Sequence, residues 1–231
     1  MLHFDEESHT YTYDGRKLVS VTQFLGRFFA IFDGPKIARR VVTNPNSKYH
    51  GRDPDDLVAE WEANSLQARK LGTLLHHNIR QQLIDGDVRG ERSDELPHFE
   101  AFIAGKDWRP LMVEEKVCCP EAGIAGTVDA VFEDSGGDVV ICDWKRAKKM
   151  KFDNRWQKAK PPIQHLDDCD LSKYSLQLSL YRHLLRERLQ DRNVSLLLVN
   201  FTDRYTEIPI REHRDEVRAL LLAHGAGEAT R

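Results

Sequence analysis

An apolar stretch in the second half of the chain ends on a carboxylate and an amine. Residues 139–145 read VVICDWK, so Asp143 and Lys145 follow an apolar run and are separated only by Trp144. Residues two apart in a strand point to the same face. This predicts that Asp143 and Lys145 lie side by side, with Trp144 packed in the core. An ammonium beside carboxylates can stabilise developing charge on a phosphate or position an attacking water. A structural salt bridge is the alternative for an isolated Asp-X-Lys.

Further carboxylates precede this pair in other predicted strands. Asp129 interrupts an apolar segment, where a charge is costly unless a cation or hydrogen-bond donors satisfy it. One segment earlier, the distance to Val117 favours Glu114 as a third carboxylate, whereas strict alternation with Val113 and Val117 favours Glu115. Two carboxylates about 4 Å apart repel by roughly 4 kcal/mol at an effective dielectric near 20. The cluster therefore predicts a divalent cation, and oxygen ligands favour Mg²⁺, with Mn²⁺ as a substitute, over zinc.

The elements that must position these residues follow from periodicity and turn residues. Alternation on both sides of Asp14-Gly15 predicts an N-terminal hairpin, followed by a helix that begins near Val21. Gly72-Thr73 interrupts a long helical pattern, which predicts a kink or a break there, and Gly225 is predicted to end the last helix. Helices are predicted over 54–84, 94–108, 171–189 and 212–225, and strands over 110–119, 123–134, 138–145, 194–201 and 204–210. A domain boundary near residue 50 is only weakly signalled.

Composition narrows the class of protein. The chain has 231 residues, of which 40% are hydrophobic and 31% charged, so it can build a core and disorder is not expected to dominate. Its net charge of −3 gives no global attraction to nucleic acid, so any such binding must come from a local patch. The acidic, polar N-terminus does not read as a signal peptide, and no apolar run reaches the roughly 20 residues of a membrane span. We expect a cytoplasmic protein without membrane association.

Five short motifs stand in a fixed order along the chain. They are GTLLH at 72–76, VEEKV at 113–117, GTVDA at 126–130, DWK at 143–145 and QLSLY at 177–181. In this order they resemble the PD-(D/E)XK nuclease superfamily, specifically its RecB-type exonuclease branch, which includes mitochondrial, viral and phage exonucleases. The resemblance covers roughly residues 9–205. Val128 stands where the superfamily's name has proline, which is usual in this branch.

The resemblance implies a ligand set and a role for each site residue. One or two Mg²⁺ ions would be held by His76, Glu114, Asp129 and Asp143, and Lys145 would assist the attacking water. Gln177 and Tyr181 are four residues apart and share a helix face; Gln177 would orient the lysine or a phosphate, and Tyr181 would pack beside the site. The alternative for this last pair is a cap on the core.

The cysteines argue against a metal cluster built on sulphur. The four cysteines are Cys118, Cys119, Cys142 and Cys169, and no two of them have the CxxC spacing. They predict neither a disulfide framework nor a zinc site, and they suit a reducing compartment. The related CRISPR-associated accessory nucleases hold an iron–sulphur cluster on four cysteines, but this spacing does not match theirs. No iron–sulphur cluster is predicted.

A basic run follows the predicted site. Residues 145–160 hold eight Lys or Arg against the single acid Asp153. This run is either a solvated face or a cradle for a phosphate backbone, with Trp156 available to stack on a base. The N-terminal aromatics Phe24, Phe28, Phe29 and Phe32 have helical spacing, which favours core packing. The residues predicted to bind nucleic acid are Lys145, Arg146, Lys148, Lys149, Lys151 and Arg155.

These expectations combine into one hypothesis. The chain is expected to be a single α/β nuclease domain, 1–231, with the restriction-endonuclease-like fold: a mixed sheet flanked by helices. Residues 1–108 would form a hairpin and a mainly helical N-terminal part, and 109–231 the catalytic sheet. The expected activity is metal-dependent exonucleolytic hydrolysis of DNA that is single-stranded or has a free end, in recombination or repair with a recombination or replication protein as a partner. The alternatives are an endonuclease or structure-specific nuclease on the same site, and a non-cleaving nucleic-acid-binding module.

Overall fold

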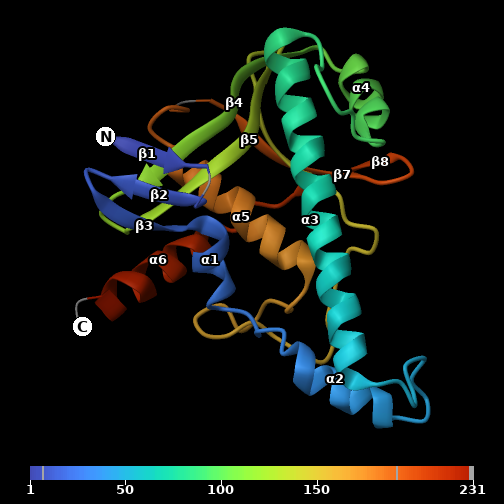
Figure 1. The fold of residues 1–231 in the computed structure, drawn as a ribbon. Helices are drawn as coiled ribbons and strands as arrows, with labels where there is room; N and C mark the ends of the chain where they lie inside the picture. Colours follow the sequence, from blue (N-terminus) through green and yellow to red (C-terminus); the bar gives the residue numbers. More distant parts are fainter. Residues whose placement is uncertain (7, 191, 229–231) are drawn as a thin grey trace.

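A mixed eight-stranded sheet organises the chain. The computed structural model describes residues 1–6, 8–190 and 192–228. Its strands are β1 (Leu2–Asp5), β2 (Thr10–Tyr13), β3 (Arg16–Ser20), β4 (Trp108–Cys119), β5 (Ile124–Asp134), β6 (Val139–Lys145), β7 (Val194–Phe201) and β8 (Tyr205–Ile210). Its helices are α1 (Val21–Gly26), α2 (Gly34–Thr43), α3 (Pro54–Asp85), α4 (Leu96–Ala104), α5 (Asp170–Leu184) and α6 (Arg214–Glu228). This arrangement confirms the predicted fold class, a mixed sheet flanked by helices (Figure 1).

The sheet divides around the middle of β5. Along one edge of β5, β4 pairs antiparallel over the full length. On the other edge, β3 pairs parallel with Ile124 and Ala125, and β6 pairs antiparallel with residues 130–133. The segment from Gly126 to Asp129 therefore lies between the ends of β3 and β6. Among the described residues, β5 has no partner strand along that edge in this segment.

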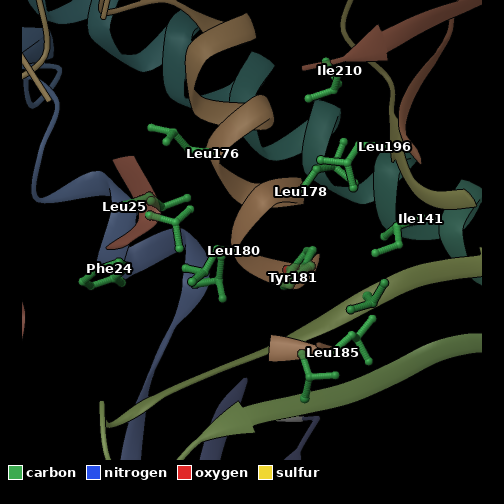
Figure 2. Packing of buried hydrophobic residues seen from close by; sticks show 14 of the residues in the cluster. Phe24, Leu25, Ile141, Leu176, Leu178, Leu180, Tyr181, Leu185, Leu196 and Ile210 are labelled. Atoms are coloured by element: carbon green, nitrogen blue, oxygen red, sulfur yellow. The ribbon is translucent and has the colours of Figure 1, made fainter. Parts of the chain in front are cut away.

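Two hydrophobic layers cover the two faces of the sheet. In β6, Val139 and Ile141 pack with α1, α5 and α6, whereas Val140, Cys142 and Trp144 pack with α3 and α4. Strict alternation along a strand buried on both sides produces this pattern. Figure 2 shows the first layer, in which side chains of α5 lie among residues of α1 and of the strands. Trp144 is 1% exposed and contacts the rings of Phe99 and Phe102, as its predicted core role requires.

The long helix α3 carries one predicted ligand. It begins after Asp53, whose carboxylate accepts hydrogen bonds from the backbone N–H groups of Asp55 and Asp56, and it ends at Gly86 with a φ of 73°. The predicted interruption at Gly72-Thr73 is wrong, because the helix continues without a break. A glycine costs a helix only about 1 kcal/mol relative to alanine, and burial of Leu75 and Ile79 holds the following turns against the sheet.

The ends of other helices also differ from expectation. Helix α6 continues past Gly225 to Glu228, since a glycine can end a helix but need not. Helix α5 ends at Leu184, earlier than the predicted residue 189. Figure 1 shows α2 and the first half of α3 extending beyond the sheet, and the side chains of residues 62–70 are exposed. None of the helices in the described part of the chain is long and apolar enough to cross a membrane.

Candidate active site

Three predicted ligands from different elements meet beside the division of the sheet. They are His76 of α3, Glu114 of β4 and Asp129 of β5, and one ligand atom from each lies within 4.8 Å of the others. His76 Nδ1 is 3.7 Å from Glu114 Oε1 and 3.5 Å from Asp129 Oδ1. One imidazole nitrogen and two carboxylates suit a divalent cation with a preference for oxygen ligands.

The backbone of β4 decides which glutamate joins this cluster. Glu114 has a φ of 50°, which a non-glycine residue adopts at a cost, and such a residue in a strand breaks the regular alternation of side chains. Its carboxylate faces His76. Glu115 pairs instead with Arg188, beyond the end of α5. The two criteria applied to the sequence conflicted because each assumed a regular strand.

The strand β5 is irregular at the same level. Val128 and Val131 both belong to the layer that contains α5, whereas Ala130 and Phe132 belong to the layer that contains α3 and α4. A regular strand would place Val128 and Ala130 on the same face. The change of face falls next to Asp129, which is 8% exposed.

The main chain of Trp144 fixes two of the ligands, a role that the sequence did not reveal. Its N–H donates to Asp129 Oδ2 at 2.7 Å, and its carbonyl oxygen lies 3.1 Å from His76 Nε2. A carbonyl oxygen can only accept, so His76 carries a proton on Nε2, and Nδ1 faces the carboxylates. Metal-binding histidines typically donate their second N–H to a carbonyl or carboxylate in this way.

Asp143 and Lys145 form a buried pair next to the cluster. Lys145 Nζ is 2.5 Å from Asp143 Oδ2, so the two side chains share a face as the spacing predicted. Asp143 is 1% exposed, and its Oδ2 has no hydrogen-bond partner of ordinary geometry among the described residues. The ammonium also lies 4.8 Å from the centre of the Tyr174 ring, a contact that the sequence did not indicate. Asp143 is not part of the three-residue cluster in the ion-free protein.

Burial and mutual attraction perturb these groups in different directions. Burial raises the pKa of Asp143 to about 6, although Lys145 opposes the shift. Burial opposes a charge on His76, but Asp129 and Glu114 overcome it and raise its pKa to about 10. Burial also opposes a charge on Asp129, yet the imidazolium of His76 keeps the pKa of Asp129 below its usual value. Perturbed titratable groups of this kind concentrate at functional sites.

Helix α5 places Gln177 and Tyr181 beside the site. Gln177 Nε2 donates to the Tyr181 hydroxyl at 3.2 Å, and Tyr181 is 4% exposed. Burial raises the pKa of the Tyr181 hydroxyl well above its usual value, so it stays protonated. The ring lies against Gly126 so closely that a Cβ there would be 2.7 Å from Tyr181 Cε1 and 3.1 Å from Val21 Cγ2. Gly126 of the GTVDA motif is therefore required for close packing of α5 on β5.

A cleft of about 790 Å³ opens next to the three ligands. Its walls come from the N-terminal hairpin, the start of α1, one face of α3, and strands β4 and β5. Thr73, His76, His77 and Arg80 recur at helical spacing along the α3 wall. Phe4, His9 and Tyr11 of the hairpin contact one another edge to face or tilted. Opposite the α3 wall, Tyr11 shares a 2.9 Å hydrogen bond with Thr127 of β5.

The basic run divides into buried and exposed members. Arg146 Nε lies 2.5 Å from Glu95 in a pair whose side chains are 14% and 8% exposed, so most of Arg146 is shielded from solvent and its contact with nucleic acid stays a prediction. Its carboxylate partner lies 51 residues earlier in the chain, where a local motif cannot reveal it. Lys148, Lys149, Lys151 and Arg155 are exposed and form no ion pair with any described residue. Trp156 is 95% exposed in the same loop.

Most of the N-terminal aromatics pack in the core. Phe24 and Phe29 are buried, and Phe28 packs partly buried against the same layer. Phe32 differs, because it is 67% exposed with its ring centre 5.8 Å from that of Trp61. Packing therefore accounts for three of the four.

The loop after β6 is held by a residue that the motifs did not include. Asn200 of β7 accepts from the Ala147 N–H at 2.8 Å and donates back to the Ala147 carbonyl at 3.0 Å. This pairing anchors the main chain just beyond Lys145. The sequence feature that could have indicated this role is an asparagine within an otherwise apolar strand.

Comparison with known proteins assigns this geometry to a family. The sequence model of the PD-(D/E)XK nuclease superfamily matches residues 36–227, most of the chain. The chain belongs to the PD-(D/E)XK nuclease superfamily. This superfamily consists of hydrolytic nucleases that use divalent metal ions, with DNA as the substrate. The three-residue cluster fits such an ion, since it presents an imidazole nitrogen and carboxylate oxygens at one place.

The other comparisons add little to the superfamily assignment. Among solved structures, a crystal structure of SSO0001 aligns with 91% of this chain and 75% of its own, at 16% identity and a TM-score of 0.38. No curated protein matches the chain. These comparisons therefore identify no branch of the PD-(D/E)XK superfamily.

Proposed function

We propose that this PD-(D/E)XK nuclease is a Mg²⁺-dependent DNA exonuclease of the RecB type, which acts on single-stranded DNA or on free DNA ends. The observation that carries the proposal is the cluster of His76, Glu114 and Asp129 with the Asp143–Lys145 pair beside it. The GTLLH motif, by which the chain resembles this branch, puts His76 on the helix that precedes the sheet. Mn²⁺ is expected to substitute for Mg²⁺ because both accept the same oxygen ligands.

The cleft supports a single strand as the substrate. Its volume of about 790 Å³ lies within the roughly 300–1,000 Å³ of small-ligand sites. A cleft of this size has room for part of a single strand. The hairpin residues Phe4, Glu6 and His9 bound the cleft near the ligands, which favours entry of an end over sliding across an open groove. The exposed Lys148, Lys149, Lys151 and Arg155 supply a basic approach to the site, with Trp156 exposed for stacking.

Each residue then has a defined task. His76, Glu114, Asp129 and Asp143 would hold the ion, which would supply Lewis-acid stabilisation of the phosphate and a more acidic bound water. Lys145 keeps a proton on Nζ, because Asp143 and Asp129 offset its burial and raise its pKa. Lys145 would donate a hydrogen bond to the attacking water or to a phosphate oxygen. Tyr174 limits the positions that the ammonium can take, and Gln177 orients the phosphate from α5.

The test is Mg²⁺-dependent digestion of end-labelled linear single-stranded DNA and of closed circular single-stranded DNA. We expect loss of the linear DNA alone, and the order of release of the two end labels gives the polarity. Lys145→Ala should lower the rate of digestion at least a hundredfold. Arg204→Gln, which changes an exposed residue outside the cleft, should leave the rate unchanged. Cutting of the circle would identify an endonuclease. Binding of DNA without cleavage, in Mg²⁺ and in Mn²⁺, would favour a non-cleaving module.

A further inference from the structure

A second pocket, rich in arginine, lies away from the metal ligands. It has a volume of about 350 Å³ and is lined by residues of α5, of the chain after it, of the start of β7 and of the start of α6. Val194 at the pocket pairs with Val139, the first residue of β6, whereas Lys145 is the last residue of that strand. Six residues of strand separate these two levels, which corresponds to about 20 Å. The pocket is therefore distinct from the catalytic cleft.

The charge of this pocket is unbalanced. Among the residues that the structure describes, its lining includes four arginines and one carboxylate, that of Glu212. Arg182 and Arg214 both pair with Glu212, so this one carboxylate serves two guanidinium groups. The two arginines hold the pKa of Glu212 below its usual value against the effect of burial. The described lining residues carry a formal charge of +3 at neutral pH, with four arginines against one glutamate and His183 uncharged.

Outside the lining, other carboxylates compensate only part of this charge. Arg192 pairs with Glu133 on the neighbouring strand and donates to the carbonyl of Gly137 at 2.9 Å. Arg186 is 57% exposed, and the nearest carboxylate, that of Glu187, is 3.6 Å away. Arg186 also lies 3.0 Å from the His183 ring. Burial and this neighbouring guanidinium lower the pKa of His183, so the imidazole is neutral and adds no charge at pH 7.

One guanidinium atom in the pocket lacks a partner. Arg182 Nε is buried and has no hydrogen-bond partner among the described residues, although the other end of the side chain pairs with Glu212. A buried donor without a partner is costly, which marks the Arg182 side chain as incompletely satisfied. Guanidinium groups match phosphate geometry with paired hydrogen bonds, and several arginines around one small space favour a doubly charged anion.

The remaining wall of the pocket is apolar. Leu189, Val194 and Val217 line it, and Leu189 and Val217 belong to the buried layer around α5. A pocket of this size, with an apolar wall and a few charged groups, is typical of a small-ligand site rather than of an open track along a polymer. We infer that this arginine pocket binds a phosphomonoester, with the phosphate on the arginines and the carbon portion of the ligand against the apolar wall.

This inference goes beyond the nuclease reaction and does not depend on it. The test is calorimetric titration of the full chain in EDTA, so that the metal site is not involved. The probes are dAMP, inorganic phosphate, deoxyadenosine and a single-stranded oligonucleotide without terminal phosphates. We expect dAMP and phosphate to bind and deoxyadenosine not to bind, because the phosphate supplies the charge that the arginines lack.

Matched variants locate the binding. Arg186→Gln combined with Arg214→Gln should weaken dAMP binding at least tenfold, and each single change at least threefold. Both side chains are largely exposed, at 57% and 74%, so the fold should tolerate the changes. Lys17→Gln combined with Arg204→Gln removes the same charge elsewhere on the surface and should change dAMP binding less than twofold. An unchanged melting temperature confirms that each variant is folded.

Three results would overturn the inference. The first is equal binding of dAMP by the wild type and the double arginine variant. The second is binding of neither dAMP nor phosphate at millimolar concentration. The third is binding of the oligonucleotide alone, which would make this face part of a track for DNA. Failure of the nuclease proposal would leave all of these measurements interpretable, because none of them requires metal or cleavage.

Discussion

Replacement of Asp143 by asparagine should make the ion-free protein relatively more stable as the pH rises. Asp143 is 1% exposed, and its pKa is raised to about 6 from an ordinary value of 3.8. The folded chain therefore holds the proton more tightly than the unfolded chain, so ionisation of this carboxylate lowers the free energy of unfolding. In this case stability is present at low pH and is lost as the pH rises from about 4 to about 6.

The magnitude follows from the difference in pKa. A change of one pKa unit corresponds to about 1.4 kcal/mol, so the shift costs the folded state about 3 kcal/mol at neutral pH relative to a protonated Asp143. About 2 kcal/mol of this cost should develop between about pH 4.5 and 7.5, since the unfolded carboxylate is already partly ionised at the lower pH. Asparagine is isosteric with the protonated acid and does not ionise. The difference between variant and wild type reports mainly on this one group.

The assay is urea unfolding of the wild type and Asp143→Asn in EDTA over that pH range. The stability of the variant relative to the wild type should increase by about 2 kcal/mol towards the higher pH. His76 and Asp129 titrate in both proteins, whereas loss of Asp143 also lowers the pKa of Lys145, because this carboxylate is the main charge that raises it. A relative stability that does not change with pH would show that Asp143 ionises normally, and the account of this buried pair would then fail. The same variant should lose nuclease activity, because it lacks one carboxylate ligand.

Three further outcomes follow from the same geometry. Gly126→Ala should lower the free energy of unfolding by about 1–3 kcal/mol in urea titrations, since its Cβ would overlap the Tyr181 ring; wild-type stability would contradict this packing. His76→Asn should weaken Mn²⁺ binding at least tenfold in calorimetry, whereas His77→Asn should not, and equal losses would exclude His76 as a specific ligand. Arg146→Gln should destabilise the fold by about 3 kcal/mol in thermal unfolding, because it leaves Glu95 buried without its partner; Lys149→Gln should instead weaken only DNA binding in fluorescence anisotropy, and the reverse pattern would restore Arg146 to the DNA surface.

Regular features of the chain were predictable from local patterns. The strands that carry Asp129 and Asp143 begin and end within one residue of their predicted limits, because their apolar runs are long and bounded by glycine or charge. The pairing of Asp143 with Lys145 followed from the two-residue repeat of a strand alone. The side of the core occupied by Trp144 followed from the same repeat.

Irregular features were not predictable in the same way. The positive φ of Glu114 could not be predicted from the residue type, since glutamate does not favour this backbone conformation. It decides which of two adjacent glutamates faces His76. The hydrogen bonds made by the Trp144 backbone could not be predicted from the sequence either, because every residue except proline carries the same N–H and C=O groups. The pairing of Arg146 with Glu95 depends on a contact between distant segments.

The charges of the site explain how its carboxylates tolerate one another before an ion binds. At neutral pH, Glu114, Asp129 and Asp143 carry three negative charges, and the protonated His76 and Lys145 carry two positive charges. The remaining charge of −1 is small, because His76 and Lys145 act as internal counter-ions. Entry of a divalent ion requires His76 to release its Nδ1 proton, and the five groups together with the ion then carry no net charge. The proton on His76 and the ammonium of Lys145 therefore offset the carboxylate charges before the ion binds, so His76, Glu114 and Asp129 already lie close together.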